Sequence, residues 1–252
     1  MSTIRYVAIG DSFTEGVGDE RPDGSVRGWA DLVAEGWARS SGAAIEYANL
    51  AIRGKLVWPI VEEQLEPALA LRPTHLSFNG GGNDMLRPRT AISHVADAFS
   101  RVLARCDEEG VRVILLSGAN PSPHLPMSRL IQRRGDELSA EVVARVEDRP
   151  DVVRALNWPD TELSAAAYWS DDRLHMNARG HHRVAARVLD ALGETVPEGW
   201  WSLPAGAARR SGGLAYYRQH VGPWVQRRLT GRSSGDGRAA KYGAWTTVEP
   251  RA

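Results

Sequence analysis

The sequence predicts an α/β fold, in which a mostly parallel β-sheet is covered by helices on both faces, followed by a C-terminal extension of different character. Short apolar runs typical of buried strands alternate with longer segments in which apolar residues recur at helical spacing. Several of the apolar runs end in glycine-rich or polar turns, which is where open α/β sheets bind ligands. At 252 residues the chain is long enough to bury a full core.

The first apolar run, residues 4–9, is short and contains β-branched residues, so it predicts a buried strand. Gly10 allows a tight turn after it, and Ser12 follows where the strand meets the next element. A serine in this place can project its hydroxyl into a cleft while its own N–H faces developing negative charge. Taken alone, however, Asp11 and Ser12 are better explained as a helix cap.

The later elements follow from the same two patterns, since apolar residues run together in strands and recur every three or four positions in helices. In order, we expect a helix from Trp29 that ends at Gly42, a strand at 44–50, a helix over 56–65, a strand at 74–78, a helix at 91–109, a strand at 111–116, a helix at 128–147, a strand at 152–156 and a helix ending at Gly193. Three glycines at 80–82 follow the third strand and indicate close backbone approach to another group.

A serine nucleophile needs a base within hydrogen-bond reach and a group that orients this base. Asp172 and His175 supply both from one polar loop, because a separation of three residues lets the carboxylate reach the imidazole of its own turn. The reaction also needs donors aimed at an oxyanion. The candidates are the Ser12 N–H, the Gly54 N–H and the Asn83 side-chain amide, which follow three predicted strands and can meet at one end of the sheet.

Two other kinds of site fit these residues poorly. A metal could be held by acidic and histidine residues in and near the same loop, namely Asp171, Asp172, His175, His181 and His182. His181 and His182 are adjacent, so they point to different sides of a helix, and we expect both on its surface. A phosphate-binding loop at the three glycines is disfavoured, because no Lys-Ser or Lys-Thr pair follows them. We therefore expect neither a metal nor a cofactor.

Composition excludes several classes of protein. The formal net charge is zero, so no overall field attracts the chain to nucleic acid or to a membrane. Cys106 is the only cysteine, which rules out an intramolecular disulfide. No apolar stretch is long enough to span a bilayer, and residues 1–5 lead directly into the first strand without room for a signal peptide. We therefore expect a cytoplasmic protein.

Four motifs together resemble the blocks of the SGNH (GDSL-type) serine hydrolase and esterase superfamily, in the family's order. They are Gly10-Asp11-Ser12-Phe13, Gly54, Gly81-Gly82-Asn83-Asp84 and Asp172-Arg173-Leu174-His175. The resemblance implies a three-layer α/β/α sandwich with a five-stranded, flavodoxin-like sheet of order 2-1-3-4-5. Strands one and three are neighbours in that order, so Ser12 and Asn83 would meet at the topological switch point.

The resemblance also implies a role for each residue. Ser12 corresponds to the nucleophile, His175 to the base and Asp172 to the partner of the base, while Ser12, Gly54 and Asn83 would form the oxyanion hole. The expected activity is hydrolysis of small, short-acyl carboxylic esters through an acyl-enzyme, with a small-molecule ester as substrate. The same site could instead serve a carbohydrate deacetylase, a thioesterase or a lysophospholipase. A different hypothesis is a binding module with a vestigial site and an anion-binding tail.

A change in charge divides the chain into a predicted catalytic domain, residues 1–195, and a C-terminal extension, residues 196–252. The extension has nine Lys or Arg against three Asp or Glu, whereas the rest of the chain has 22 against 28. Opposite charges and several tryptophans favour docking of residues 200–224 on the catalytic domain or on a partner subunit, which would allow a homo-oligomer. We expect residues 233–237 to be mobile, and we expect no nucleic-acid partner.

Overall fold

The computed structural model describes residues 3–202 and 233–251. In chain order the elements are β1 (Arg5–Ile9), α1 (Ser12–Glu15), α2 (Trp29–Ser41), β2 (Ile45–Asn49), α3 (Val57–Ile60), η1 (Val61–Leu65), α4 (Glu66–Ala70), β3 (His75–Phe78), α5 (Gly82–Met85), α6 (Ile92–Glu108), β4 (Arg112–Leu116), η2 (Ser122–His124), α7 (Ser128–Arg145), β5 (Val153–Ala155), η3 (Ala166–Tyr168), α8 (Ala178–Leu192) and β6 (Tyr242–Val248). Strands alternate with helices along most of this order, as the sequence predicts.

The described strands form one six-stranded sheet of order β5-β4-β3-β1-β2-β6. The first five strands pair in parallel and contain the predicted order 2-1-3-4-5. The prediction of five strands was incomplete, because β6 from the C-terminal extension adds to β2 in antiparallel orientation, with Val248 opposite Ile45. The β6 residues are half-buried or exposed, so this strand lacks the continuous apolar run that identifies the buried strands.

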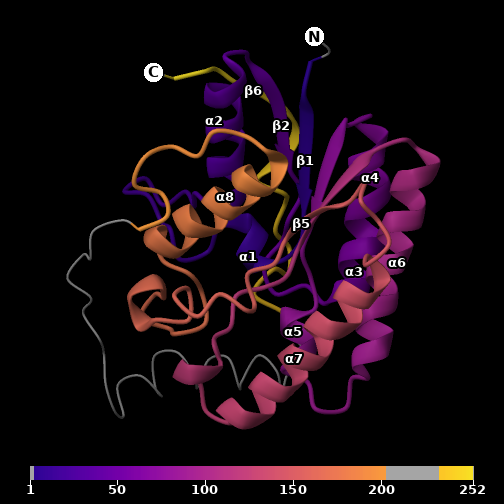
Figure 1. The fold of residues 1–252 in the computed structure, drawn as a ribbon, viewed down its shortest axis with the longest axis vertical. Coiled ribbons are helices and arrows are strands. Elements are labelled where there is room, and N and C mark those ends of the chain that lie inside the picture. The colour runs from indigo at the N-terminus through magenta and orange to yellow at the C-terminus, as the bar shows by residue number, and fades with distance from the viewer. Residues whose placement is uncertain (1–2, 203–232, 252) are drawn as a thin grey trace.

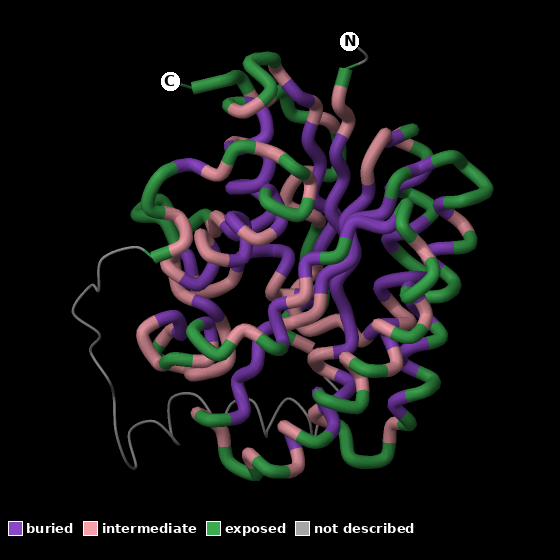
Figure 2. Tube along the Cα trace, in the orientation of Figure 1, coloured by how far each residue is buried: buried purple, intermediate pink, exposed green. Residues whose placement is uncertain are grey.

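Helices cover both faces of the sheet and complete a three-layer α/β/α sandwich (Figure 1). The helices α2 and α8 lie on one face, and α3, α4, α6 and α7 lie on the other. Successive residues of β1 serve the two layers in turn: Tyr6 and Ala8 pack with α2 and α8, while Val7 and Ile9 pack with α3 and α6. Buried residues accordingly run along the central strands, and exposed residues lie on the outer helix surfaces (Figure 2).

The predicted helix over residues 56–65 is interrupted in the structure. It divides into α3, the π-helical stretch η1 and α4, and Pro67 near the start of α4 has no N–H with which to continue an α-helical pattern. The π-helical stretch contains Gln64, whose buried amide accepts from the Gly10 N–H at 2.9 Å and donates to the Gly10 carbonyl at 3.0 Å. The interruption therefore helps to fix the end of β1, two residues before Ser12.

The described parts of the C-terminal extension contact the rest of the fold. Trp200 packs against the core cluster shared by α2 and α8. Most of the range 200–224, for which docking was predicted, falls within 203–232 and lies outside the described residues. Residues 233–237, which we expect to be mobile, form a hydrogen-bonded turn in this structure, in which the Ser233 N–H donates to the Asp236 carboxylate at 2.8 Å. The division into two domains stays a prediction.

Within residues 3–202 and 233–251, every helix is too short or too polar to cross a lipid bilayer.

Candidate active site

Ser12 lies at the junction between β1 and α1. The preceding residue, Asp11, caps α1, since its carboxylate accepts a hydrogen bond from the Phe13 N–H at 3.0 Å. A Cβ at Gly10 would lie only 2.4 Å from a threonine hydroxyl of α1, so this turn leaves room for glycine alone. The helix-cap interpretation therefore holds for Asp11, while the hydroxyl of Ser12 faces His175.

Ser12, His175 and Asp172 form a continuous chain of hydrogen bonds. Ser12 Oγ lies 3.0 Å from His175 Nε2, and His175 Nδ1 lies 2.5 Å from Asp172 Oδ2. The other oxygen of Asp172 accepts from the N–H groups of Leu174 and His175, both at 2.9 Å, and from Ser170 Oγ at 2.8 Å. The loop thus fixes its own carboxylate, and the structure brings together three residues singled out in the sequence.

Asp172 is held in its ionised form. Burial alone would raise the pKa of its carboxyl, but the hydrogen bond and the charge of His175, together with the backbone donors, lower the pKa below its usual range. An ionised carboxylate next to Nδ1 favours the imidazole tautomer that carries its proton there. Nε2 is then free to accept a proton from Ser12 Oγ, so the arrangement can activate this serine as a nucleophile.

Asn83 lies in α5, which follows β3, and its side chain reaches towards the end of β1. Asn83 Nδ2 donates to the Lys55 carbonyl at 2.9 Å and to Asp11 Oδ2 at 3.3 Å. The first bond ties Asn83 to the loop after β2, and the second ties it to the residue before Ser12. The structure thereby joins the three strand ends that the sequence predicts to meet.

Gly54 lies in the loop between β2 and α3 with a positive φ of 78°, a conformation that favours glycine. Among the described residues, the N–H groups of Gly54 and Ser12 donate no hydrogen bond to another backbone group. Ser12, Asn83 and His175 line a common cavity, whereas neither Gly54 nor Lys55 is among its described lining residues. The Lys55 carbonyl accepts from Asn83 Nδ2, which connects the loop of Gly54 to the cavity wall.

Buried acidic groups surround the predicted site. Burial raises the pKa of Asp11 to about 6, although its hydrogen bond from Phe13 and the nearby His175 act in the opposite direction. Burial also raises the pKa of Asp84, whose carboxylate accepts from the Val57 N–H at 3.0 Å and so fixes the start of α3. Asp84, the last residue of the Gly81-Gly82-Asn83-Asp84 motif, therefore has a structural role.

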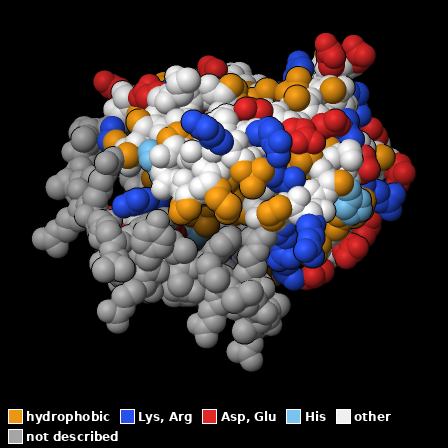
Figure 3. Space-filling model, turned by 90° about the horizontal axis from the view of Figure 1, so that it is seen from below, with side chains coloured by type: hydrophobic (Ala, Val, Ile, Leu, Met, Phe, Trp, Pro, Cys, Tyr) orange, Lys and Arg blue, Asp and Glu red, His pale blue; other side chains and the backbone are white. Residues whose placement is uncertain are grey.

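The cavity extends from Ser12 towards α7 and has a volume of about 950 Å³, including its open mouth. Its lining is mostly apolar and comes from several elements: Met85, Leu86, Phe99, Leu116, Leu138, Val142 and Trp158. Gly135 is needed in this wall, since a Cβ there would lie 2.0 Å from the Trp158 ring. Seen from below, the described surface shows hydrophobic side chains gathered around a hollow, with Lys and Arg beside them (Figure 3).

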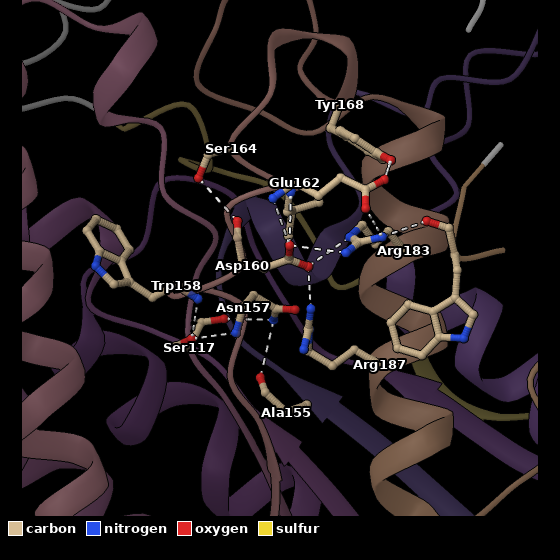
Figure 4. Close-up of polar contacts among 12 residues, drawn as sticks. Ser117, Ala155, Asn157, Trp158, Asp160, Glu162, Ser164, Tyr168, Arg183 and Arg187 are labelled. Atoms are coloured by element: carbon tan, nitrogen blue, oxygen red, sulfur yellow. Dashed lines mark hydrogen bonds and ion pairs between the residues drawn. The ribbon is translucent and has the colours of Figure 1, made fainter. Parts of the chain in front are cut away.

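A polar network anchors the segment between β5 and the loop of His175 (Figure 4). Asp160 pairs with Arg183 and Arg187, which lie one turn apart on α8. At the start of the segment, Ser117 Oγ accepts from the N–H groups of Asn157 and Trp158 at 2.8 and 2.9 Å. These contacts fix the wall of the cavity that contains the Trp158 ring.

His181 corrects one sequence prediction. It was expected on the helix surface, but it is fully buried between α8 and α2, where its Nδ1 accepts from the Trp29 N–H at 3.1 Å and its Nε2 donates to the Val17 carbonyl at 3.2 Å. Burial lowers its pKa to about 4, so the ring is neutral. His182 is half-buried against Trp200. The described residues contain no group of three His, Cys, Asp or Glu arranged to hold a metal ion.

Sequence reasoning missed the groups that support the loop of Gly54. Glu15, at the end of α1, accepts from the Arg53 N–H at 2.7 Å and from the Arg53 guanidinium at 2.6 Å. Lys241 donates to the Glu15 carbonyl at 2.7 Å from the C-terminal extension. No spacing in the sequence signals these contacts, because each partner is far away along the chain.

Several solved structures with the same fold are named as esterases. Axe2, an acetylxylan esterase from Geobacillus stearothermophilus, is 20% identical, with a TM-score of 0.63 over 81% of this chain and 98% of that chain. The psychrotrophic esterase EstA from Pseudoalteromonas sp. is 15% identical, with a TM-score of 0.58 over 75% and 96%. At these identities the likeness concerns the fold. No curated protein shows significant sequence similarity to this chain.

The sequence itself also matches a family model. The matched region is residues 8–183, more than half of the chain, and it includes Ser12, Gly54, Asn83, Asp172 and His175. The family is that of carboxylic ester hydrolases built on the α/β/α fold described above. The chain therefore belongs to the GDSL-like Lipase/Acylhydrolase family.

Proposed function

We propose that this chain is a serine esterase that cleaves small carboxylic esters through an acyl-enzyme on Ser12. The observation that carries the proposal is the unbroken chain of hydrogen bonds from Ser12 Oγ through His175 to the ionised Asp172. Each link has the length needed for proton transfer or for orientation of the imidazole. The family match supports the reaction class.

In the first half-reaction, Ser12 Oγ attacks the ester carbonyl carbon while His175 Nε2 takes the hydroxyl proton. The resulting tetrahedral intermediate collapses, the bond to the leaving alcohol breaks, and His175 donates its proton to that oxygen. In the second half-reaction, His175 removes a proton from water, which attacks the acyl carbon and forms a second tetrahedral intermediate. This intermediate collapses, the bond between Ser12 Oγ and the acyl carbon breaks, and His175 returns its proton to Oγ as the carboxylic acid leaves. Asp172 stays ionised throughout and stabilises the imidazolium.

The negative oxygen of the intermediate needs donors that are in place before the reaction. We assign this role to the N–H groups of Ser12 and Gly54 and to the Asn83 amide. Both hydrogens of Asn83 Nδ2 already have acceptors, at 2.9 Å on Lys55 and at 3.3 Å on Asp11. The longer bond is the weaker one, so the oxyanion would replace Asp11 as acceptor while Lys55 keeps the amide in place.

The cavity beside Ser12 supports an apolar acyl group as the part of the substrate that is held. Its wall includes Phe99, Leu138 and Val142, which offer few polar partners for a sugar. Each methylene buried there contributes about 0.8 kcal/mol, so a butyryl ester should exceed an acetyl ester in kcat/KM by about tenfold. A carbohydrate deacetylase, by contrast, would show no such gain.

A chain-length series of p-nitrophenyl esters tests the proposal, with the wild-type protein and Ser12→Ala assayed side by side. We expect turnover by the wild type alone, rising from acetate to butyrate. Leu138→Trp, which fills the cavity far from the reacting atoms, should remove the gain for longer chains and leave acetate hydrolysis largely intact. Turnover of no ester would favour a binding module, and equal turnover by Ser12→Ala would contradict the assignment of the nucleophile.

A further inference from the structure

The turn at residues 233–237, here called the C-terminal turn, packs directly on the loop that carries Gly54. Gly235 is buried, and a Cβ at that position would lie 2.1 Å from the carbonyl oxygen of Arg53. A Cβ at Gly54 would in turn lie 2.4 Å from Ser233 Oγ and 2.9 Å from Ser234 Oγ. Because both positions are glycine, the C-terminal turn and the loop of Gly54 can approach closely. A larger residue at either position would force the two segments apart.

This contact involves the peptide unit between Arg53 and Gly54, which carries a proposed oxyanion donor. The Arg53 carbonyl and the Gly54 N–H belong to one planar trans peptide, in which they point in opposite directions. Gly235 meets the carbonyl end of that peptide. Contact there restricts the direction of the Gly54 N–H, which is one of the proposed oxyanion donors.

Other contacts hold the same loop from the side of β1 and α1. The Ile52 N–H donates to the Gly10 carbonyl at 3.2 Å, and the Arg53 N–H donates to the Glu15 carboxylate at 2.7 Å. These bonds fix the loop up to Arg53. The following peptide unit has the C-terminal turn as its neighbour.

Lys241, between the C-terminal turn and β6, also connects the C-terminal extension to α1. Its ammonium group donates to the carbonyls of Glu15 at 2.7 Å and Val26 at 3.1 Å and to the Asp31 carboxylate at 2.7 Å, with only 13% of the side chain exposed. The chain then enters β6, which pairs with β2, the strand that leads into the loop of Gly54. The C-terminal segment therefore contacts this loop, the strand β2 that leads into it, and α1, whose Glu15 holds Arg53.

We infer that the C-terminal turn positions the oxyanion side of the active site, and that Gly235 is the positioning residue in direct contact with it. This inference rests on the proposed function, and it concerns a segment beyond residues 8–183, which the family model matches. The C-terminal extension would then contribute to catalysis without touching the substrate.

Gly235→Ala in the full-length protein tests the inference, with Gly243→Ala as the matched control. Gly243 lies in β6, where an added Cβ meets nothing within 4 Å. Active sites are counted by titration with an organophosphonate, so that kcat refers to competent molecules only. We expect Gly235→Ala to lower kcat by about 10- to 100-fold at nearly unchanged KM, since loss of an oxyanion donor costs up to about 10²–10³. Gly243→Ala should match the wild type.

Binding of a boronic acid, which forms a tetrahedral adduct with serine, distinguishes displacement of the oxyanion donors from a general loss of folded protein. Its affinity should fall by the same factor as kcat/KM in Gly235→Ala, because both depend on the oxyanion donors. A variant with wild-type kcat per titrated site and wild-type boronate affinity would overturn the inference. So would a loss of activity that is fully explained by fewer titratable sites.

Amide hydrogen exchange distinguishes failure of this inference from failure of the proposed function. Displacement of the loop in Gly235→Ala should speed exchange of the Ile52 and Arg53 amides, whose hydrogen bonds to Gly10 and Glu15 would loosen. If the wild type hydrolyses no ester, the proposed function is wrong, yet the exchange rates still report whether Gly235 holds this loop. Unchanged exchange at both amides would contradict the inference under either outcome.

Discussion

The two sides of the proposed active site are built in different ways. On the base side, His175 and Asp172 come from one turn, and the carboxylate is held by N–H groups of the same few residues. On the oxyanion side, Gly54 comes from the loop after β2 and Asn83 from α5, and their positions depend on Glu15 and Lys55. A local arrangement keeps its geometry when distant parts shift, whereas one assembled from several loops depends on the packing of the whole sheet.

The largest expected effect comes from removal of the residue that the two sides share. Ser12→Ala should lower kcat by about 10⁵–10⁶-fold, because the other residues then have no nucleophile on which to act. The wild type should also gain the mass of an organophosphonate, since an activated serine attacks phosphorus as it attacks a carbonyl. EstA is described as inhibited by monoethylphosphonate. Intact-protein mass spectrometry decides this, and a label that persists in Ser12→Ala would refute the assignment.

Asp172→Asn tests the base side. The amide cannot hold the imidazole in the tautomer that accepts the serine proton, so kcat should fall by about 10⁴-fold. Because the turn is local, far-ultraviolet circular dichroism should stay unchanged. Asp171→Asn is the matched control, as the neighbouring carboxylate has no hydrogen bond to His175 in the described structure. If Asp171→Asn lowered kcat by this factor and Asp172→Asn left kcat unchanged, Asp171 would be the orienting acid.

Asn83→Ala tests the oxyanion side and should have a smaller effect. About 10²–10³-fold in kcat is expected, since the N–H groups of Ser12 and Gly54 remain. Asn83→Asp provides a second comparison, because an acceptor in place of the donor should lower kcat at least as far. Steady-state kinetics with p-nitrophenyl butyrate gives both values. A wild-type kcat in Asn83→Ala would exclude this side chain from the oxyanion hole.

The smallest effect concerns stability and the buried Asp11, which lies between the two sides. Its folded-state pKa of about 6 exceeds the ordinary value of 3.8, so the folded protein binds this proton more tightly than the unfolded chain. The resulting stabilisation is present below pH 4 and is lost as pH rises through 6. Relative to Asp11→Asn, the wild type should therefore lose about 1–3 kcal/mol of unfolding free energy between pH 4 and pH 8.

Urea unfolding of both proteins across this pH range measures the difference. Asp190→Asn, at an exposed position of α8, serves as the control and should follow the wild type at every pH. If the difference in unfolding free energy between the wild type and Asp11→Asn stayed the same at every pH, the Asp11 carboxyl would not titrate with a raised pKa.

The same contrast explains what the sequence could predict. The alternation of strands and helices and the Asp172–His175 pair depend on short-range patterns, whereas the order of the first five strands was implied by the family resemblance. Gln64, Glu15 and His181 carry no such signal, because their hydrogen bonds connect residues 38 to 164 positions apart and arise only when the layers pack. The strand β6 was missed because its residues are half-buried or exposed and include no continuous apolar run.

The pairing of β6 with β2 also bears on how the protein avoids association with itself. Without β6, β2 would be an edge strand with a free row of backbone N–H and C=O groups, which is a template for pairing with another chain. At the opposite edge, β5 is only three residues long and offers little to pair with. Cleavage between residues 202 and 242 that released β6 would therefore move this edge of the sheet from β6 to β2 and expose the backbone groups of β2, through which we expect the clipped protein to aggregate.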